Sequence, residues 1–213
     1  MTIHNILWQV NGALFDTYPA LTYSFSKALS EMGVSAALNV IDGLVRRSLD
    51  DCLDTLSGRF KLDRQLLREK FLESYRSISP ASQMPFPGVR DLCEFIHGNG
   101  GLNLALTDTG VEFADRLLET HQISGWIADT LYMETGDANQ TDPALLRAVL
   151  DRYSLNPGET LLIVTRGLDV QAGRMAGIRT CLYGRAETNY AADIQIEKFS
   201  QLLRLLAAEE GKE

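Results

Sequence analysis

The chain has 213 residues, of which 45% are hydrophobic and 23% charged, and its formal net charge is −8. That length suits one core domain with a smaller insert. The acidic balance disfavours nucleic acid and anionic membranes, which bind to basic patches. Three widely spaced cysteines fit no zinc or disulfide framework, and neither a membrane span nor a signal peptide is predicted. We therefore expect a cytoplasmic protein.

The first part of the chain predicts one strand followed only by helices. Residues 3–10 form an apolar run that ends at Asn11-Gly12, which is typical of a buried strand. Apolar residues at helical spacing then predict helices over 20–32, 49–56 and 66–75, with no strand between 16 and 84. A proline-rich stretch at 80–88 ends this helical part.

The second part of the chain alternates between strands and helices. Strands are predicted over 102–106, 126–132, 161–164 and 180–183, and helices over 89–97, 111–118, 142–153, 170–176 and 196–208. This alternation indicates an α/β fold with a mostly parallel sheet covered on both faces. We therefore expect a Rossmann-like core formed by residues 1–15 and 86–213, with residues 16–85 inserted as a helical cap.

In parallel sheets the ligand crevice lies at the carboxyl ends of the strands. The candidate functional residues are therefore those that directly follow each strand, at 9–13, 107–109, 140 and 165–169. These segments resemble, in order and spacing, the motifs of the haloacid dehalogenase (HAD)-like hydrolases, and especially the phosphoglycolate phosphatase and β-phosphoglucomutase branch. The matching text is Leu7-Trp8-Gln9-Val10-Asn11-Gly12-Ala13-Leu14-Phe15-Asp16-Thr17, Pro87-Gly88-Val89, Leu104-Ala105-Leu106-Thr107, Gln140-Thr141-Asp142-Pro143 and Val164-Thr165-Arg166-Gly167-Leu168-Asp169. The resemblance implies a HAD-like core with an inserted helical cap.

The same motifs depart from the family at the positions that carry its chemistry. The resemblance implies an aspartate nucleophile where Gln9 stands and an aspartate general acid/base where Asn11 stands, and neither amide can perform those roles. Ala13, Gln140 and Thr165 replace the family's Thr, its Lys and a Mg²⁺-associated Asp. We therefore expect no intact catalytic residue and no metal ligand set, because Mg²⁺ requires anionic oxygens.

Three interpretations of this site remain open. It is a retired site whose side chains only satisfy backbone groups, or a repurposed site that binds a phosphorylated or anionic ligand, or a rearranged site that still hydrolyses phosphomonoesters through Asp108 or Asp169. A protein partner is an alternative to the small ligand, and Mg²⁺ is expected as a cofactor only if hydrolysis is retained. The candidate ligand-binding residues are Asn11, Thr107, Asp108, Arg166, Asp169 and Arg47.

Several of these residues also have a purely structural interpretation. Arg166 is as well explained by an ion pair with Asp169 or Asp108 as by a ligand. Asp108 is interpreted first as an exposed loop residue and second as a replacement carboxylate. Arg46 and Arg47 either begin a solvated helix or clamp an anionic ligand from the cap.

Overall fold

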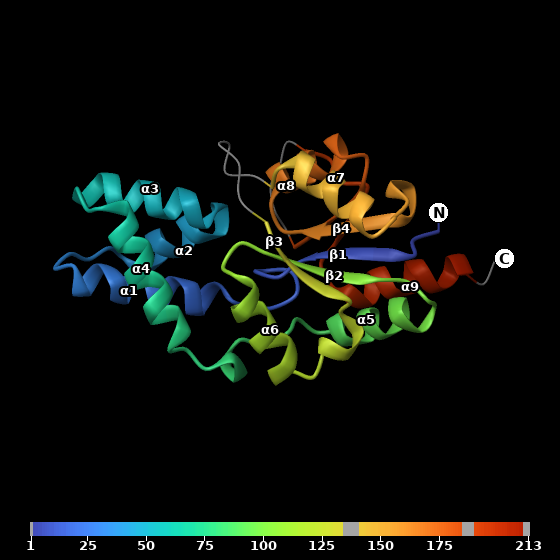
Figure 1. Ribbon diagram of the computed structural model, residues 1–213, viewed down its shortest axis with the longest axis horizontal. Helices are drawn as coiled ribbons and strands as arrows, with labels where there is room; N and C mark the ends of the chain where they lie inside the picture. Colours follow the sequence, from blue (N-terminus) through green and yellow to red (C-terminus); the bar gives the residue numbers. More distant parts are fainter. Residues whose placement is uncertain (1, 134–140, 185–189, 211–213) are drawn as a thin grey trace.

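The computed structural model describes residues 2–133, 141–184 and 190–210 (Figure 1). Its centre is a six-stranded parallel sheet in the order β3-β2-β1-β4-β5-β6. The first strand, β1, lies in the middle of the sheet, with β2 on one side and β4 on the other. The ends of these three strands therefore lie side by side. The strands are β1 Asn5–Gln9, β2 Asn103–Thr107, β3 Asp129–Tyr132, β4 Thr160–Val164, β5 Arg179–Tyr183 and β6 Ile194–Ile196.

Helices cover both faces of the sheet, as expected for an α/β core (Figure 1). Because side chains alternate along a strand, Ile6 and Trp8 of β1 face one helical layer and Leu7 faces the other. The indole Nε1 of buried Trp8 donates to Asn103 Oδ1 at 3.0 Å, which ties β1 to β2. One layer comprises α5 Val89–Gly98, α6 Val111–Thr120 and α9 Phe199–Glu210, and the other comprises α7 Pro143–Arg152 and α8 Gly167–Met175.

Four further helices lie at the carboxyl end of the sheet and have their own apolar cluster (Figure 1). Phe25 and Phe71 stack at its centre with ring centroids 4.1 Å apart. Phe113 of α6 joins the same cluster and connects these helices to the core. They are α1 Tyr18–Glu31, α2 Leu38–Arg47, α3 Leu49–Phe60 and α4 Arg64–Arg76, and we call them the cap.

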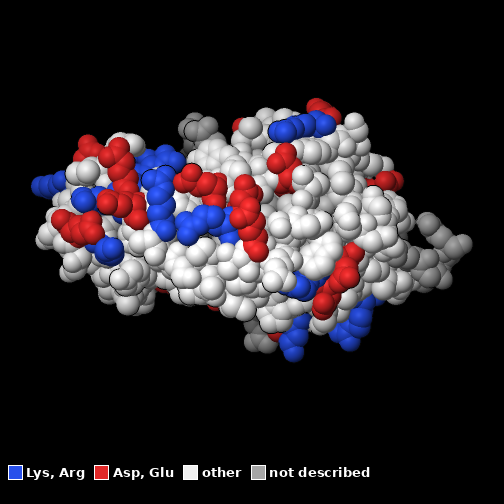
Figure 2. All heavy atoms as spheres, turned by 60° about the horizontal axis from the view of Figure 1, so that its bottom comes forward, with Lys and Arg blue, Asp and Glu red and all other residues white. Residues whose placement is uncertain are grey.

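The surface of the cap carries mixed charge. Figure 2 shows basic and acidic side chains intermingled over the cap end of the molecule. Two of the cap's ion pairs are Lys70 with Glu31 at 3.1 Å and Arg64 with Asp54 at 2.5 Å. On the face in Figure 2, positive and negative groups therefore largely offset each other.

The expected fold class is confirmed, whereas several details of the predicted elements are wrong. The segment 38–47 forms α2, and Arg46 and Arg47 end that helix instead of beginning one. The next helix begins because Ser48 Oγ accepts a hydrogen bond from Asp51 N at 2.9 Å. The strand expected at 126–132 begins only at Asp129, after a turn of 3₁₀ helix, and β6 was not predicted.

Cys52, Cys93 and Cys181 are free and buried, which agrees with the expectation of apolar surroundings. Burial raises the pKa of Cys181 to about 12, so this thiol stays protonated and unreactive at neutral pH. No helix in the described ranges is both long and apolar enough to cross a membrane.

Gly173 is expected to be required for packing α8 onto the sheet. A Cβ at this position would lie 2.7 Å from Thr180 Cγ2 and 2.8 Å from Leu162 Cδ2. Overpacking of this kind costs about 1–3 kcal/mol, which outweighs the helix propensity of ~1 kcal/mol gained with alanine. Gly173→Ala should therefore lower the free energy of unfolding measured by urea denaturation.

The matched control is Gly43→Ala at an exposed position of α2, where nothing lies within 4 Å of the added Cβ. This variant should gain up to ~1 kcal/mol of stability from helix propensity. Equal stabilisation by both variants would contradict the close packing of α8.

Candidate functional site

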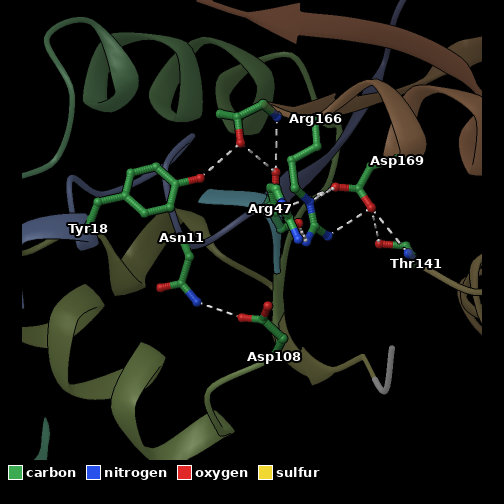
Figure 3. Close-up of polar contacts among 9 residues, drawn as sticks. Asn11, Tyr18, Arg47, Asp108, Thr141, Arg166 and Asp169 are labelled. Carbon is green, nitrogen blue, oxygen red and sulfur yellow. Dashed lines mark hydrogen bonds and ion pairs between the residues drawn. The ribbon is translucent and has the colours of Figure 1, made fainter. Parts of the chain in front are cut away.

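The predicted functional residues converge at the carboxyl edge of the sheet, between the core and the cap (Figure 3). Gln9 ends β1, Thr107 ends β2, and Thr165 directly follows β4. These three strands are neighbours, so residues about 60 to 160 positions apart in the sequence meet here. Asp169 reaches the same place from the first turn of α8.

Asp169 is the buried centre of the site, with none of its surface exposed to solvent. Arg166 binds it with two nitrogens, Nε to Oδ2 at 2.5 Å and Nη2 to Oδ1 at 2.9 Å. Thr141 donates to Oδ1 through its backbone N at 3.1 Å and its Oγ1 at 3.0 Å. A paired and hydrogen-bonded carboxylate can be buried, whereas an isolated one cannot. The expectation of an Arg166 ion pair is therefore confirmed.

Gln9 is held by hydrogen bonds on both sides of its amide. The backbone N–H of Thr165 can only donate, and it contacts Gln9 Oε1 at 3.0 Å. The amide nitrogen is thereby directed toward Asp169 Oδ2, at 3.4 Å. The reverse orientation would place the amide nitrogen against the Thr165 N–H and the amide oxygen against Asp169 Oδ2, so the network determines the amide orientation.

The Thr165 hydroxyl relays this network to the cap. It contacts Gln9 Oε1 at 3.3 Å, and because that oxygen can only accept, the hydroxyl hydrogen points toward Gln9. The Tyr18 hydroxyl of α1, 3.1 Å from Thr165 Oγ1, is therefore the donor in that contact. Burial raises the pKa of Tyr18, so it keeps the proton that it donates.

Asn11 and Asp108 form a second polar group on the other side of β1. Asn11 Nδ2 donates to Asp108 Oδ1 at 2.6 Å, and Thr17 Oγ1 donates to Asn11 Oδ1 at 2.9 Å. The interpretation of Asp108 as an exposed loop residue is wrong, because Asn11 holds it in a partly buried position. Burial raises the pKa of Asp108, although Arg166 and the hydrogen bond from Asn11 oppose the rise.

Thr107 has its own internal partner. Its buried Oγ1 accepts from the backbone N of Thr109 at 3.2 Å and lies 3.0 Å from Thr109 Oγ1. The hydroxyl therefore closes the turn that follows β2. Thr107 belongs to the site by position, and its hydroxyl is engaged in this turn.

The cap closes over this network through Arg47. Arg166 Nη1 donates to the backbone oxygen of Arg47 at 2.7 Å. The side chain of Arg47 is exposed and pairs with Asp51 of α3 instead. The predicted clamp residue therefore contributes its carbonyl, and its guanidinium does not enter the site.

The space left among these groups is small. A cavity of about 20 Å³ is lined by the polar residues Gln9, Thr107, Asp108, Thr141 and Arg166, together with apolar neighbours. Such a volume holds about one water molecule. In this closed conformation the described part of the site is thus filled by its own side chains.

The residues of the described site do not fit Mg²⁺. Gln9 and Thr165 supply no charge, and both oxygens of Asp169 already accept hydrogen bonds. Within residues 2–133, 141–184 and 190–210, no cluster of three or more His, Cys, Asp or Glu residues could hold a metal ion. Gln140, the replacement for the family lysine, lies outside the described residues.

Sequence reasoning missed Tyr18, Thr17 and Thr141 as members of the site. Tyr18 and Thr17 stand at the start of α1, where only the folded cap brings them to the strand ends. Thr141 directly follows the family's lysine position, and that adjacency was the available signal. Arg46 also approaches the site, with its guanidinium 4.3 Å from the centre of the Tyr18 ring.

Comparison with known proteins gives a consistent set of relatives. A family model described as haloacid dehalogenase-like hydrolase matches residues 6–183. The phosphoglycolate phosphatase of Aliivibrio fischeri is 23% identical, covering 95% of this chain and 96% of its own. The N-acetylmuramic acid 6-phosphate phosphatase of Pseudomonas putida is 24% identical and covers 97% of each chain. A crystal structure of a predicted phosphoglycolate phosphatase from Haemophilus somnus has a TM-score of 0.80 at 16% identity, covering 96% of this chain and 98% of that one.

The raised pKa of Asp108 predicts a specific pH dependence of stability. A carboxyl whose pKa is raised by folding stabilises the protein when protonated, and this contribution is lost as the pH rises through the folded-state pKa. Asp108→Asn cannot ionise and keeps an oxygen that can accept from Asn11. The variant should therefore gain stability relative to the wild type as the pH rises above about 4, the ordinary pKa of aspartate, measured by urea denaturation.

An exposed aspartate on α7, Asp151, provides the control. Asp151→Asn should change the free energy of unfolding by no more than about 0.5 kcal/mol. If Asp108→Asn instead lost stability over the same pH interval, the buried carboxylate would be a net stabilising charge and our assignment would be wrong.

Proposed function

The chain belongs to the haloacid dehalogenase-like hydrolase family, as its motifs predict, and we propose that it is a pseudoenzyme that has lost phosphatase catalysis. In this proposal it binds a phosphorylated or other anionic small molecule between cap and core. The observation that carries the proposal is Gln9, an amide held by Thr165 and Asp169 at the family's nucleophile position.

The chemistry of the two amides supports loss of turnover. A carboxamide has no anionic oxygen for attack on phosphorus, and Asn11 has no proton to exchange near neutral pH. Loss of general acid/base help alone typically removes a factor of about 10²–10⁴ in rate. Phosphate monoesters are among the slowest substrates to react unaided, so little useful activity would remain.

Two arginines near the cavity support an anionic ligand, and each of them also has an acidic partner, Asp169 for Arg166 and Asp42 for Arg46. Arg166 lines the cavity, and Arg46 lies against Tyr18 at its cap side. Since the closed cavity of about 20 Å³ holds about one water molecule, the ligand requires the cap to move away from the core. A protein partner for the cap is the alternative occupant in this proposal.

A second candidate function is phosphomonoester hydrolysis by a rearranged site, and the relatives favour it over loss of catalysis. Proteins named phosphoglycolate phosphatase and N-acetylmuramic acid 6-phosphate phosphatase match nearly the whole chain. Asp108 is the residue for this alternative, because it lines the cavity and burial raises its pKa, so it holds a proton at higher pH than an ordinary aspartate. It stands directly after Thr107 at the end of β2.

We also propose a cytoplasmic location. The support is the set of three free, buried thiols, Cys52, Cys93 and Cys181. Unpaired cysteines are usual in reducing compartments, whereas secreted proteins commonly oxidise theirs to disulfides.

A phosphatase assay separates the two functions. The purified chain is mixed with 2-phosphoglycolate, N-acetylmuramic acid 6-phosphate or an aryl phosphate, with and without Mg²⁺, and phosphate release is measured. We expect no release above the protein-free rate, since Gln9 cannot form a phosphoenzyme. Calorimetric titration with the same compounds in the same buffer tests binding.

Turnover in the ordinary enzymatic range of about 1–10³ s⁻¹ would contradict the pseudoenzyme proposal. In that event Asp108→Asn should abolish activity if the rearranged site is responsible, and Asp151→Asn should leave it intact. Activity that survives Asp108→Asn would exclude Asp108 as the replacement group.

A further inference from the structure

We propose that Arg166 is the resident cation of this site, taking the place of a divalent metal at Asp169 and at the same time latching the cap to the core. The inference rests on the contacts of Asp169 and of α2. It is tested by metal binding and by the dynamics of the cap, not by phosphate release, so its failure can be distinguished from failure of the proposed function.

The first step is the saturation of Asp169. A carboxylate offers about four lone-pair positions. Here Oδ1 accepts from Arg166 Nη2 and from the N and Oγ1 of Thr141, while Oδ2 accepts from Arg166 Nε and Gln9 Nε2. A divalent cation could reach these oxygens only by displacing the guanidinium. Asp169 is therefore occupied as a ligand by the chain's own cation.

The second step is that the pair is formed by local structure. Arg166 is the N-cap residue of α8 and Asp169 lies in the first turn, so the two are three residues apart. Folding of this one turn brings them together, without any contribution from the cap. Both side chains are largely shielded, with 12% of Arg166 and 0% of Asp169 exposed. The ion pair between Arg166 and Asp169 therefore forms when α8 folds.

The third step concerns Arg166 Nη1, the guanidinium nitrogen that makes no hydrogen bond to Asp169. Arg47 is the last residue of α2, and carbonyls in the last turn of a helix have no partner within the helix. They carry partial negative charge, which a cation stabilises. Arg166 Nη1 donates to the Arg47 oxygen at 2.7 Å and so satisfies this group. Tyr18 adds the neighbouring cap-to-core hydrogen bond to Thr165.

These steps lead to an Asp169 that Arg166 neutralises and a cap that is closed without a metal or ligand. Figure 3 shows Arg166 between Asp169 on one side and Arg47 on the other. Arg166 is a positioning residue in this scheme, because it acts on Asp169 and on α2. The cap opens only when the contact between Arg166 and the Arg47 carbonyl breaks.

Thermal unfolding with millimolar Mg²⁺ or with EDTA tests the cation. The wild type should melt at the same temperature in both. Gln9→Asp should also show no Mg²⁺ response, because Arg166 still covers Asp169. Gln9→Asp combined with Arg166→Met places two carboxylates together without the guanidinium, and this double variant should melt at a higher temperature in Mg²⁺ than in EDTA.

Two results would overturn the assignment. One is an Mg²⁺-dependent rise in the melting temperature of the wild type or of Gln9→Asp alone. The other is a folded double variant with no Mg²⁺ response, because removal of Arg166 would then have freed no site. Neither readout involves phosphate release, so the outcome is independent of the phosphatase assay.

Hydrogen–deuterium exchange of the full chain tests the latch. The neutral variant Arg166→Met with Asp169→Asn removes both buried charges together, which avoids leaving one unpaired. We expect faster exchange in residues 38–48 than in the wild type, because the end of α2 loses its anchor to the core.

The matched control is Arg152→Met with Asp129→Asn, which removes an exposed ion pair of 3.2 Å on the core. It should leave exchange in residues 38–48 unchanged. Identical exchange of this segment in the wild type and in the Arg166 and Asp169 variant would show that Arg166 does not hold the cap.

Discussion

A buried carboxylate has to be neutralised, and this requirement at Asp169 organises the whole site. Moving an unpaired charge from water into the interior of a protein is far more costly than a single neutral hydrogen bond can repay. The Arg166 fork, the Thr141 donors and the Gln9 amide all act on this one group. Nη1 of the same guanidinium then joins the core to the cap, by donating to the backbone oxygen of Arg47.

The parallel sheet explains why such distant residues can act together. Strands β2, β1 and β4 are neighbours and all run in one direction, so their carboxyl ends form a single edge. Burial on both faces keeps β1 in register, since Ile6 and Trp8 pack into one layer and Leu7 into the other. The geometry of the edge is therefore a property of the apolar core, and it survives changes in the polar residues that the edge presents.

The elements with strong periodic patterns could be predicted from the sequence, and those defined by tertiary contacts could not. Helix α7 was predicted because Asp142-Pro143 is a local start signal, and Asp142 does accept from Ala144 N at 2.7 Å. Helix α2 is an exception, because Ile41, Leu44 and Val45 keep helical spacing and the helix was still not predicted, whereas β6 is only three residues long. Tyr18 was not predicted as a site residue, because its contact with Thr165 depends on how the cap packs against the core, and no local sequence pattern indicates that.

Similarity to known proteins describes the fold of the chain, whereas the chemistry of the site depends on individual side chains. Likeness over nearly the whole chain to phosphatases reflects the core and cap, which many sequences can form. Catalysis depends on a handful of side chains, and amides stand at the two positions where the resemblance to the family implies aspartates. A shared fold is therefore compatible with either of the proposed functions, and the distinction lies at Gln9, Asn11 and Asp108.

The replacements at this edge are consistent with one another in charge. Carboxylates at positions 9 and 165 beside Asp169 would need a cation of higher charge than a guanidinium provides. With Gln9 and Thr165 neutral, one carboxylate remains at the centre, and the single positive charge of Arg166 balances it. An aspartate restored at position 9 alone would thus be a second negative charge beside a site already neutralised. The neutral residues at positions 9 and 165 and the presence of the internal cation are therefore consistent parts of one electrostatic arrangement.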